Sequence, residues 1–353
     1  MIPFGGVIRD AAGNVYGTTE LGGAYDYGAV FKVDASGNTT ILYSFSGGTH
    51  DGQAPEAGLV RDNNGNLYGT LWAGPACGSV FKLDSAGNET LIYSFSCGTD
   101  GANPSAALIR DSAGSLYGTT SYGGDLSCGS GDGCGTVFQI SPAGNETVLY
   151  SFTGGSDGVD PVGGLVRDAA GNLYGTTWFG GTSGNGIVFK IEADGVETVL
   201  YSFAGGTDGA APLASLIQDA SGNLYGTTSG GGAYGYGTIF EVDATGAETI
   251  LHSFAGTGLD GAYPYSSLVR DSNGNLLGTT YEGGAYGKGT VFRMSLAGKM
   301  KLLHSFTGGT GGSFPFAGVI ADPAGNLYGT TAHAGASTQG RRQGCGTVFK
   351  LTP

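Results

Sequence analysis

A short run of small and apolar residues recurs along the whole chain. Its clearest copy is Leu173-Tyr174-Gly175-Thr176-Thr177, preceded by Asn172. Self-similarity at a period of about 50 residues is typical of propellers, solenoids and arrays. The central glycine of this run occurs seven times, at Gly17, Gly69, Gly118, Gly175, Gly226, Gly278 and Gly329.

Each repeat contains four apolar runs, which we name strands A to D. In the fourth repeat, strand A lies within residues 161–168, between a proline and an aspartate, and strand B is residues 173–177. Strand C has the pattern Gly-Thr-Val-Phe-Lys-Leu, and strand D the pattern Glu-Thr-Leu-Ile-Tyr-Ser-Phe. Asp-x-x-Gly-Asn segments join A to B and C to D, and such segments favour tight turns.

This pattern predicts an all-β, seven-bladed β-propeller with four-stranded blades, because β-branched and aromatic residues recur without helical periodicity. An open solenoid is the alternative, but no atypical capping repeat is visible. One domain, residues 1–353, is therefore expected. Its repeats are approximately 3–54, 55–103, 104–160, 161–211, 212–263, 264–314 and 315–353.

Strand D occurs six times, whereas strands A, B and C occur seven times. The last strand C ends at Leu351, and only Thr352 and Pro353 follow it. The last blade is thus expected to lack its outer strand and to leave residues 346–351 as an unpaired edge, which invites pairing with another chain. Either a piece was lost or cut away, which we favour, or a neighbouring molecule donates the strand.

Composition narrows the function classes. The net charge is −14 and charged residues are only 12% of the chain, which argues against nucleic acid or anionic lipid as a partner. No run of 18 apolar residues exists, so no transmembrane span is expected. The start, Met1-Ile2-Pro3, has no signal-peptide pattern, which fits a cytosolic protein or a mature or trimmed chain.

The cysteines suggest an oxidising compartment. Cys128 and Cys134 bracket a glycine-rich insertion in the third repeat, and a disulfide between them is expected. Two unpaired thiols are the alternative. Cys77 and Cys97 could form a second pair in the second repeat, which leaves Cys345 over.

The B–C loops and D–A linkers share one face of a propeller, and they carry the length variation among the repeats. Function is usually carried by loops on a rigid scaffold, so this face is the candidate. Both tryptophans fall at the third position after the central glycine. Candidate ligand-binding residues on this face are Trp72, Trp178, Tyr281, Tyr122, Phe179 and Tyr265. They suit a sugar or another polar organic ligand, although aromatics that merely cover blade rims are an equal alternative.

Carboxylates on the same face offer weaker chemistry. Glu20, Glu56 and Glu282 are candidate catalytic residues for glycosidase or lyase chemistry. The D–A linkers carry lone aspartates, which could bind Ca²⁺ but are better explained as turn-forming residues. No nucleophile motif or metal-ligand pair accompanies them, so no cofactor is expected.

The repeated segments Leu-Tyr-Gly-Thr-Thr, Gly-Thr-Val-Phe-Lys-Leu and Gly-Gly-Thr-Asp-Gly resemble the GloVer tandem repeat of "choice-of-anchor" bacterial proteins. This resemblance covers essentially the whole chain and implies an exported or surface-attached protein. It supplies no catalytic residues. The Asp-x-x-Gly-Asn-Leu-Tyr hairpin also resembles NHL and SMP-30-like propellers, which include metal-holding lactonases, but the strand-A carboxylates of such a site are mostly Gly, Ala or Ser here.

The preferred hypothesis is a secreted or cell-surface, non-enzymatic binding or structural propeller that recognises an envelope or matrix polysaccharide. The alternatives are a carbohydrate-active enzyme that uses Glu20, Glu56 or Glu282, and a self-assembling subunit that uses the open seventh blade.

Overall fold

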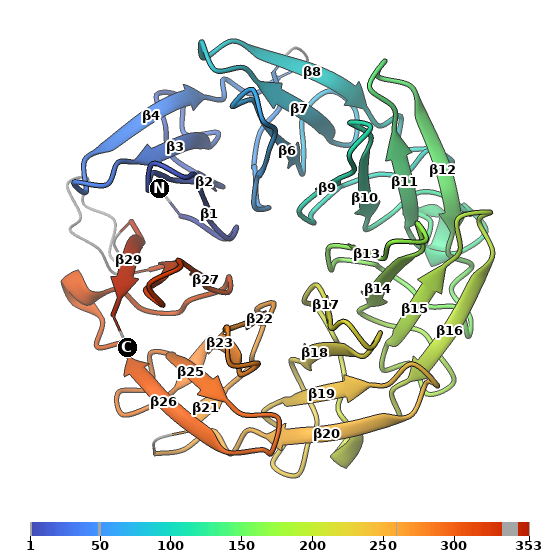
Figure 1. Cartoon of the computed structure of the whole chain (residues 1–353). Coiled ribbons are helices and arrows are strands. Elements are labelled where there is room, and N and C mark those ends of the chain that lie inside the picture. Colours follow the sequence, from blue (N-terminus) through green and yellow to red (C-terminus); the bar gives the residue numbers. More distant parts are fainter. Residues whose placement is uncertain (1, 49–50, 259, 334–344, 353) are drawn as a thin grey trace.

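The seven repeats form seven antiparallel sheets arranged as blades around one axis, so the chain is an all-β, seven-bladed propeller (Figure 1). This is a computed structural model that describes residues 2–48, 51–258, 260–333 and 345–352. The first and last blades are neighbours in the ring (Figure 1). The expected fold is confirmed.

Strands B and C form the buried middle of the first six blades, since they pack on neighbouring blades with both faces. The B strands are β2 Val15–Thr19, β6 Leu67–Leu71, β10 Leu116–Thr120, β14 Leu173–Thr177, β18 Leu224–Thr228, β23 Leu276–Thr280 and β28 Leu327–Thr331. The C strands are β3 Ala29–Val33, β7 Ser79–Leu83, β11 Thr136–Ile140, β15 Ile187–Ile191, β19 Thr238–Val242, β25 Thr290–Met294 and β29 Thr347–Leu351.

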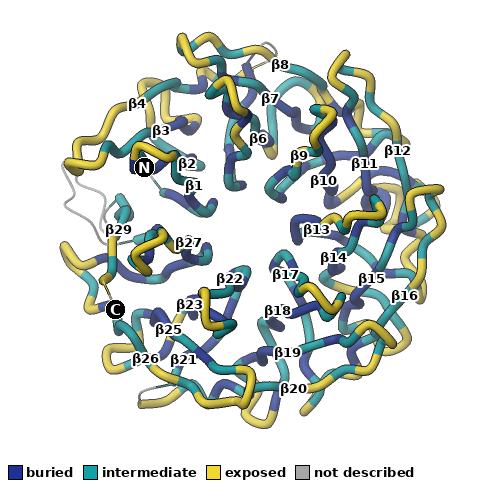
Figure 2. The backbone as a smooth tube through the Cα atoms, in the orientation of Figure 1, coloured by how far each residue is buried: buried dark blue, intermediate teal, exposed yellow. Residues whose placement is uncertain are grey.

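The D strands form the partly exposed outer edge of the ring, and the A strands line its centre (Figure 2). The D strands are β4 Thr39–Ser44, β8 Glu89–Ser94, β12 Glu146–Ser151, β16 Glu197–Ser202, β20 Glu248–Ser253 and β26 Met300–Ser305. The A strands are β1 Ile8–Arg9, β5 Val60–Arg61, β9 Ile109–Arg110, β13 Val166–Arg167, β17 Ile217–Gln218, β22 Val269–Arg270 and β27 Ile320–Ala321.

The A strands are shorter than the apolar runs suggested. In the fourth blade the run spans residues 161–168, yet only Val166 and Arg167 pair with strand B. The run opens with Pro161, which has no N–H to donate to a ladder, and continues through the small residues that line the central channel.

Short strands, isolated bridges and 3₁₀ turns lie between the main strands. Strands β21 Gly261–Ala262 and β24 Glu282–Gly283 pair with each other, and isolated bridges occupy the equivalent place in other blades. Single 3₁₀ turns lie at η1 Gly129–Gly131, η2 Gly206–Asp208 and η3 Gly309–Gly311. No helix in the described part of the chain has the length and apolarity that a membrane span requires.

The strand-B motif is scaffold, and each of its residues has a separate packing role. In the fourth blade, Tyr174 Oη donates to the Asp168 carboxylate at 3.0 Å. Gly175 lies under the ring of Phe189, whose Cζ would be only 2.5 Å from an added Cβ. Thr176 Oγ1 donates to the carbonyl of Ala214 in the next blade at 3.2 Å.

This threonine bond recurs between every pair of neighbouring blades. The donors are the first threonines of the motif, and the acceptors lie at the second position after each proline. The pairs are Thr18–Ala57, Thr70–Ala106, Thr119–Gly163, Thr176–Ala214, Thr227–Ser266, Thr279–Ala317 and Thr330–Gly5.

The seventh blade has three strands among the described residues, as expected from the repeat count. Its outermost strand is β29, whose residues are only partly buried, whereas β25 in the sixth blade is mostly buried. Six strand-C phenylalanines contact the phenylalanine that ends the previous blade's strand D, at centroid distances of 5.0 to 5.5 Å. Phe31 in the first blade has no such partner among the described residues.

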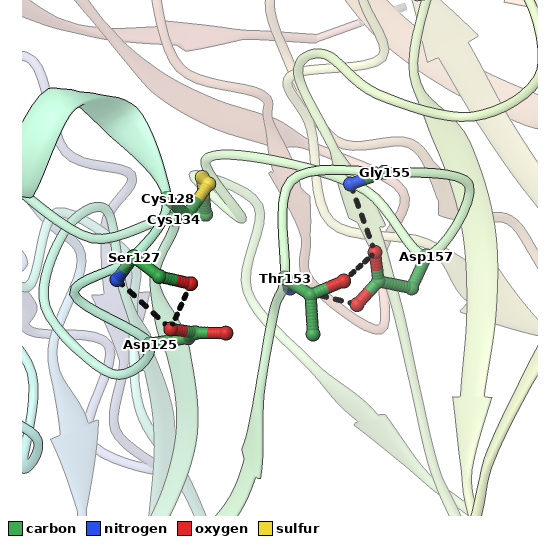
Figure 3. Close-up of a disulfide and its surroundings, with 7 residues drawn as sticks. All are labelled: Asp125, Ser127, Cys128, Cys134, Thr153, Gly155 and Asp157. Carbon is green, nitrogen blue, oxygen red and sulfur yellow. Dashed lines mark hydrogen bonds between the residues drawn. A yellow bond between two sulfur atoms is a disulfide. The ribbon is translucent and has the colours of Figure 1, made fainter.

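Both expected disulfides are present. Cys77–Cys97 ties the B–C loop of the second blade to the linker that follows, with a Cα–Cα distance of 5.1 Å. Cys128–Cys134 closes the inserted loop of the third blade. Figure 3 shows this disulfide beside the turn in which Asp157 accepts hydrogen bonds from Thr153 and Gly155. Cys345 is not disulfide-bonded.

The linker aspartates are turn-forming, since hydrogen bonds occupy their carboxylates. Tyr43 Oη donates to Asp51 at 2.9 Å, and the Ser46 hydroxyl donates to the other oxygen of the same carboxylate at 2.6 Å. The arrangement repeats in the following blades. In the fifth blade His252 replaces the tyrosine and lies 3.2 Å from Asp260.

Candidate functional site

A cavity of about 430 Å³ opens on the B–C/D–A face at the mouth of the central channel; we call it the bowl. The residue after each proline lines the bowl in all seven blades, so these positions form a ring around the axis. The ring consists of Phe4, Glu56, Ser105, Val162, Leu213, Tyr265 and Phe316. The remaining lining residues come from the first four blades: Glu20, Trp72, Ser121, Tyr122, Asp160 and Trp178.

The residue before the proline makes backbone hydrogen bonds to two loops beside the bowl, as Asp160 illustrates. Asp160 has a φ of 60°, and its N–H donates to the carbonyl of Cys134 in the same repeat at 3.0 Å. The carbonyl of Asp160 accepts the N–H of Trp178 at 2.9 Å. A positive φ is costly for a residue with a side chain, so these two bonds help to maintain it. The tryptophan is therefore placed by backbone bonds to the linker.

Two aromatic side chains of the bowl are accessible from solvent. Trp72 is 39% exposed and Tyr122 is 41% exposed. Trp178 is less exposed and stacks on Phe179, with ring centroids 4.7 Å apart. Phe179 is exposed but does not line the bowl. Three of these predicted residues thus share one cavity, and Phe179 supports one of them.

Aromatic rings from the last blades and the first form one side of the bowl. Phe316 stacks on Tyr265 at 5.1 Å and meets the edge of Phe4 at 5.3 Å. Tyr281 packs against Tyr265 at 5.3 Å and Phe314 at 5.0 Å, and it does not line the cavity. Of the two predicted tyrosines in this region, Tyr265 lines the bowl and Tyr281 packs behind it.

Three carboxylates line the bowl. Burial and, to a smaller extent, the nearby charge of Glu20 together raise the pKa of Glu56 to about 7. Burial also raises the pKa of Glu20. Burial raises the pKa of Asp160 to about 6, against a hydrogen bond from Ser121 that lowers it. Glu282, the third carboxylate predicted from the sequence, is exposed in β24 and lies outside the bowl.

Asp160 was not singled out from the sequence. It is 7% exposed, and its Oδ1 has no hydrogen-bond partner among the described residues. Asp160 and Tyr122 line the same cavity, and the negative charge of Asp160 raises the pKa of Tyr122. The position before the proline varies among the blades, as Ala54, Asn103, Asp160 and Tyr263 illustrate, and that variation was the available signal.

The channel below the bowl is narrow and lined by small residues. Its volume is about 300 Å³, and its wall is built from paired small residues such as Gly5-Gly6, Ala106-Ala107 and Gly163-Gly164. Glu56 is the charged residue at its mouth. A ligand in the bowl therefore meets carboxylates and aromatic rings before it meets the channel.

A larger hollow of about 680 Å³ lies on the opposite face between the fourth and fifth blades. Its lining consists of the repeated turns, including Asp168, Asp219 and Asp243. The carboxylates of these aspartates accept hydrogen bonds from their own turns, for example from Asn172 at 2.7 Å and from Thr245 at 2.7 Å. Since the same bonds recur in the turns of other blades, we interpret this hollow as the space between two neighbouring blades and not as a ligand site.

The bowl has the means to bind a polar organic ligand by ring stacking and hydrogen bonding. The pair Glu20 and Glu56 also has the acid–base character that general acid catalysis requires. No group of three or more His, Cys, Asp or Glu residues in the described ranges is arranged to hold a metal ion.

Solved structures with this fold have little sequence in common with the chain. The extracellular domain of BT4673 from B. thetaiotaomicron, described as a hybrid two component system, has a TM-score of 0.62 and 13% identity over 93% of this chain. A puromycin hydrolase variant has a TM-score of 0.59 and 13% identity over 96% of this chain. A protein described as a 6-phosphogluconolactonase, from Bacteroides uniformis, has a TM-score of 0.53 and 15% identity over 92% of this chain.

These matches show the fold alone. The chain spans 36% of the length of BT4673, 50% of the puromycin hydrolase and 88% of the Bacteroides uniformis protein. No match was found among the curated protein sequences that were compared.

The repeat itself identifies the family. The model of the Gloeobacter/Verrucomicrobia repeat matches residues 2–221 and 206–353, which together cover the propeller from its first strand to its last. The matched region contains all seven copies of the strand-B motif and the bowl. The resemblance inferred from these repeats is confirmed, and the chain belongs to the Gloeobacter/Verrucomicrobia repeat family.

Proposed function

We propose that the chain is a secreted or cell-surface binding propeller whose bowl takes a polysaccharide. The observation that carries this proposal is the meeting of exposed Trp72 and Tyr122 with three carboxylates in one cavity of about 430 Å³. That volume lies within the usual range of ligand sites, roughly 300–1,000 Å³. Flat rings stack on the apolar faces of sugars, and carboxylates accept hydrogen bonds from hydroxyl groups.

An exported location is supported by the two disulfides, Cys77–Cys97 and Cys128–Cys134. Disulfides form and persist in oxidising compartments and are rare in the cytosol. The acidic composition, with a net charge of −14, also suits a partner other than an anionic polymer.

Calorimetric titration with a panel of soluble envelope and matrix polysaccharides tests the proposal. Trp72→Ala is expected to weaken binding at least tenfold, because it removes an exposed ring from the cavity wall. Tyr234→Ala is the matched control, since Tyr234 is 62% exposed and does not line the bowl. Equal loss in both variants, or no binding to any polysaccharide by the wild-type protein, would contradict the proposal.

A second candidate is a carbohydrate-active enzyme that uses the same bowl. The observation in its favour is Glu56, whose pKa of about 7 suits a general acid, beside Glu20, which can act as base or nucleophile. Turnover of any polysaccharide in the panel that disappears in Glu56→Gln would establish this candidate over binding alone. Binding without turnover in the wild-type protein would remove it.

A third candidate is self-assembly through β29, in which a second copy of the chain pairs with the outer strand of the seventh blade. The observation in its favour is the partial exposure of residues in β29 whose equivalents in β25 are buried. Unpaired edges expose backbone donors and acceptors that another strand can satisfy. Sedimentation at several protein concentrations tests this candidate.

A further inference from the structure

We propose that the ligand of the bowl carries protonated amino groups, which bind at Glu20 and Glu56 and, separately, at Asp160. The glycan expected is therefore one with free amines, such as a de-N-acetylated amino sugar. This inference rests on the proposed polysaccharide-binding function and specifies the chemistry of that same site.

The first step is the unpaired acceptor of Asp160. This side chain is 7% exposed, and its Oδ1 is buried without a hydrogen-bond partner among the described residues. A buried polar atom that lacks a partner is destabilising, and native structures seldom retain one without a reason. Asp160 lines the bowl, so a ligand there can supply the missing donor.

The second step is the presence of two more carboxylates in the same cavity. Glu56 is partly buried, and its interaction with Glu20 is repulsive when both are charged. A cation placed among like charges relieves their repulsion and favours their ionised forms. An ammonium group offers three N–H donors and no acceptor, and ionised carboxylates are acceptors only, so the two are complementary.

The third step is the aromatic wall. Trp72 and Tyr122 are exposed and line the same cavity as Asp160. Cations bind favourably over the faces of Trp and Tyr rings. A neutral sugar would use the rings but would leave the negative charges uncompensated.

The fourth step is the charge balance around the bowl. None of its lining residues is Lys, Arg or His. On the same face Lys288 lies over the ring of Phe314, 4.8 Å from its centroid, and neither residue lines the bowl. The described lining thus holds three acidic side chains and no basic one to offset them.

Binding of a cation is expected to expel protons from the bowl. Glu56 and Asp160 are partly protonated near neutral pH when the bowl is empty, and the other titratable groups of the lining are Glu20, Tyr122 and Tyr265. An ammonium group stabilises the ionised carboxylates and thereby lowers their pKa values. Proton release on binding is thus a direct signature of the proposed contact.

The experiment is calorimetric titration of the full chain with three tetrasaccharides at pH 5.5, where the ligand amines are already protonated and cannot take up the protons that the carboxyl groups release. These are the free-amine glucosamine tetramer, its fully N-acetylated form and cellotetraose, which has hydroxyl groups instead. The free-amine form is expected to bind at least tenfold more tightly than either neutral form. Repeating the titration in two buffers of different ionisation enthalpy is expected to show net proton release.

Variants locate the contact. Glu56→Gln and Asp160→Asn are each expected to weaken binding of the free-amine tetramer about tenfold or more and to leave cellotetraose unaffected. Glu282→Gln is the matched control, because Glu282 is a carboxylate on the same face outside the bowl. Melting curves establish that each variant is folded, and the comparison of wild-type ligands does not depend on any variant.

Each outcome decides one of the two proposals. If the neutral tetramers bind as tightly as the free-amine form, the inference is overturned, but the proposed polysaccharide-binding function is still supported. Absence of binding by all three glycans overturns the inference, and the wider polysaccharide panel then decides the proposed function separately. Preference for the free-amine form that is unchanged in both Glu56→Gln and Asp160→Asn would also overturn the inference.

Discussion

Thr330 Oγ1 donates a hydrogen bond to the carbonyl of Gly5 at 3.2 Å, across 325 positions of sequence. This bond links the seventh blade to the first. Its six equivalents link blades that are consecutive along the chain, whereas this one links blades from opposite ends of the described residues. The closure of the ring therefore repeats the contact that the strand-B motif makes everywhere else.

Thr330→Val is expected to destabilise the protein by about 1–2 kcal/mol, because it leaves a buried carbonyl without its donor. Urea denaturation measures the loss. Thr176→Val is the matched comparison, since Thr176 makes the same bond to Ala214 between blades that the chain connects. We expect equal losses of global stability, but increased hydrogen exchange in the first and last blades only for Thr330→Val. Identical exchange patterns would contradict a special role in closure.

The strand-B glycine provides a second prediction. Gly175→Ala is expected to cost about 1–3 kcal/mol, because the added methyl group would overlap the ring of Phe189 in a closely packed core. Thermal unfolding measures this cost. Gly155→Ala is the control, since its nearest neighbours would be 3.9 Å or more from the added carbon. A well-tolerated Gly175→Ala would show that the motif glycine is not required for packing.

The sequence predicted this scaffold well, because every blade makes the same physical demand. Seven copies of Leu-Tyr-Gly-Thr-Thr and of strand C could be aligned with one another, so blade count, strand order and the missing outer strand followed directly. The short extent of the A strands did not follow. It depends on which small residues face the channel, and apolar character alone does not distinguish channel wall from ladder.

Stability is expected to fall as the pH rises from about 5 to about 8. Burial, together with the charge of a linker aspartate, raises the pKa of four strand-D glutamates to about 7. Their pKa in the unfolded chain is about 4.5. The folded state thus binds more protons, so this stabilisation is complete below pH 4.5 and is lost as the pH rises through 7. The four residues are Glu89, Glu146, Glu197 and Glu248.

Urea midpoints measured between pH 5 and pH 8 test this slope. Replacing all four glutamates by glutamine is expected to flatten it, whereas Glu282→Gln, at an exposed carboxylate, is expected to leave it unchanged. Below about pH 4 the opposite trend is expected. Hydrogen bonds from Asn326 lower the pKa of Asp322 to about 2, so its contribution is lost as the pH falls.

The repeats also vary in a correlated way at this cluster. A tyrosine in one strand D is accompanied by a glutamate in the strand D of the next blade, as Tyr201 in the fourth blade and Glu248 in the fifth illustrate. The hydroxyl of Tyr201 donates to Asp208 at 2.7 Å. In the sixth blade Met300 stands in place of the glutamate, and the preceding strand D contributes His252. The tyrosine-to-histidine change at His252 therefore coincides with the replacement of the glutamate by Met300 in the neighbouring blade.

Reduction of Cys77–Cys97 is expected to destabilise the native state by about 3 kcal/mol, from the loop entropy that a bridge of this span removes in the unfolded chain. The Cys77→Ala/Cys97→Ala variant is expected to reproduce this loss in urea denaturation. Reducing agent is expected to affect this variant less than the wild-type protein, through the remaining bridge. An equal effect on both would show that Cys77–Cys97 contributes little.

The site was only partly predictable from sequence. Rows of equivalent positions that vary among blades led to Trp72, Trp178, Tyr122 and Glu56, and the structure brings these into one cavity. The same rows could not separate Tyr281 from them, because whether a ring faces the bowl or packs behind it depends on its neighbours. The proposed role of Asp160 depends on the burial of its side chain and on an Oδ1 that has no hydrogen-bond donor. Neither feature can be inferred from a single amino-acid sequence.

The edge of the seventh blade gives the last prediction. If a second copy pairs with β29, sedimentation is expected to show a concentration-dependent dimer. The peptide Glu-Thr-Val-Leu-Tyr-Ser-Phe, which is the sequence of both residues 146–152 and residues 197–203, is expected to dissociate it. In the intact blades this segment pairs with strand C in the register Thr136↔Ser151 to Ile140↔Glu146, and its final phenylalanine packs on the next blade. The peptide can therefore cover β29 and supply the ring that Phe31 lacks.

A scrambled peptide with the same composition is the control. A protein that stays monomeric at every concentration would exclude self-assembly through this edge, and a dimer insensitive to the peptide would place the interface elsewhere.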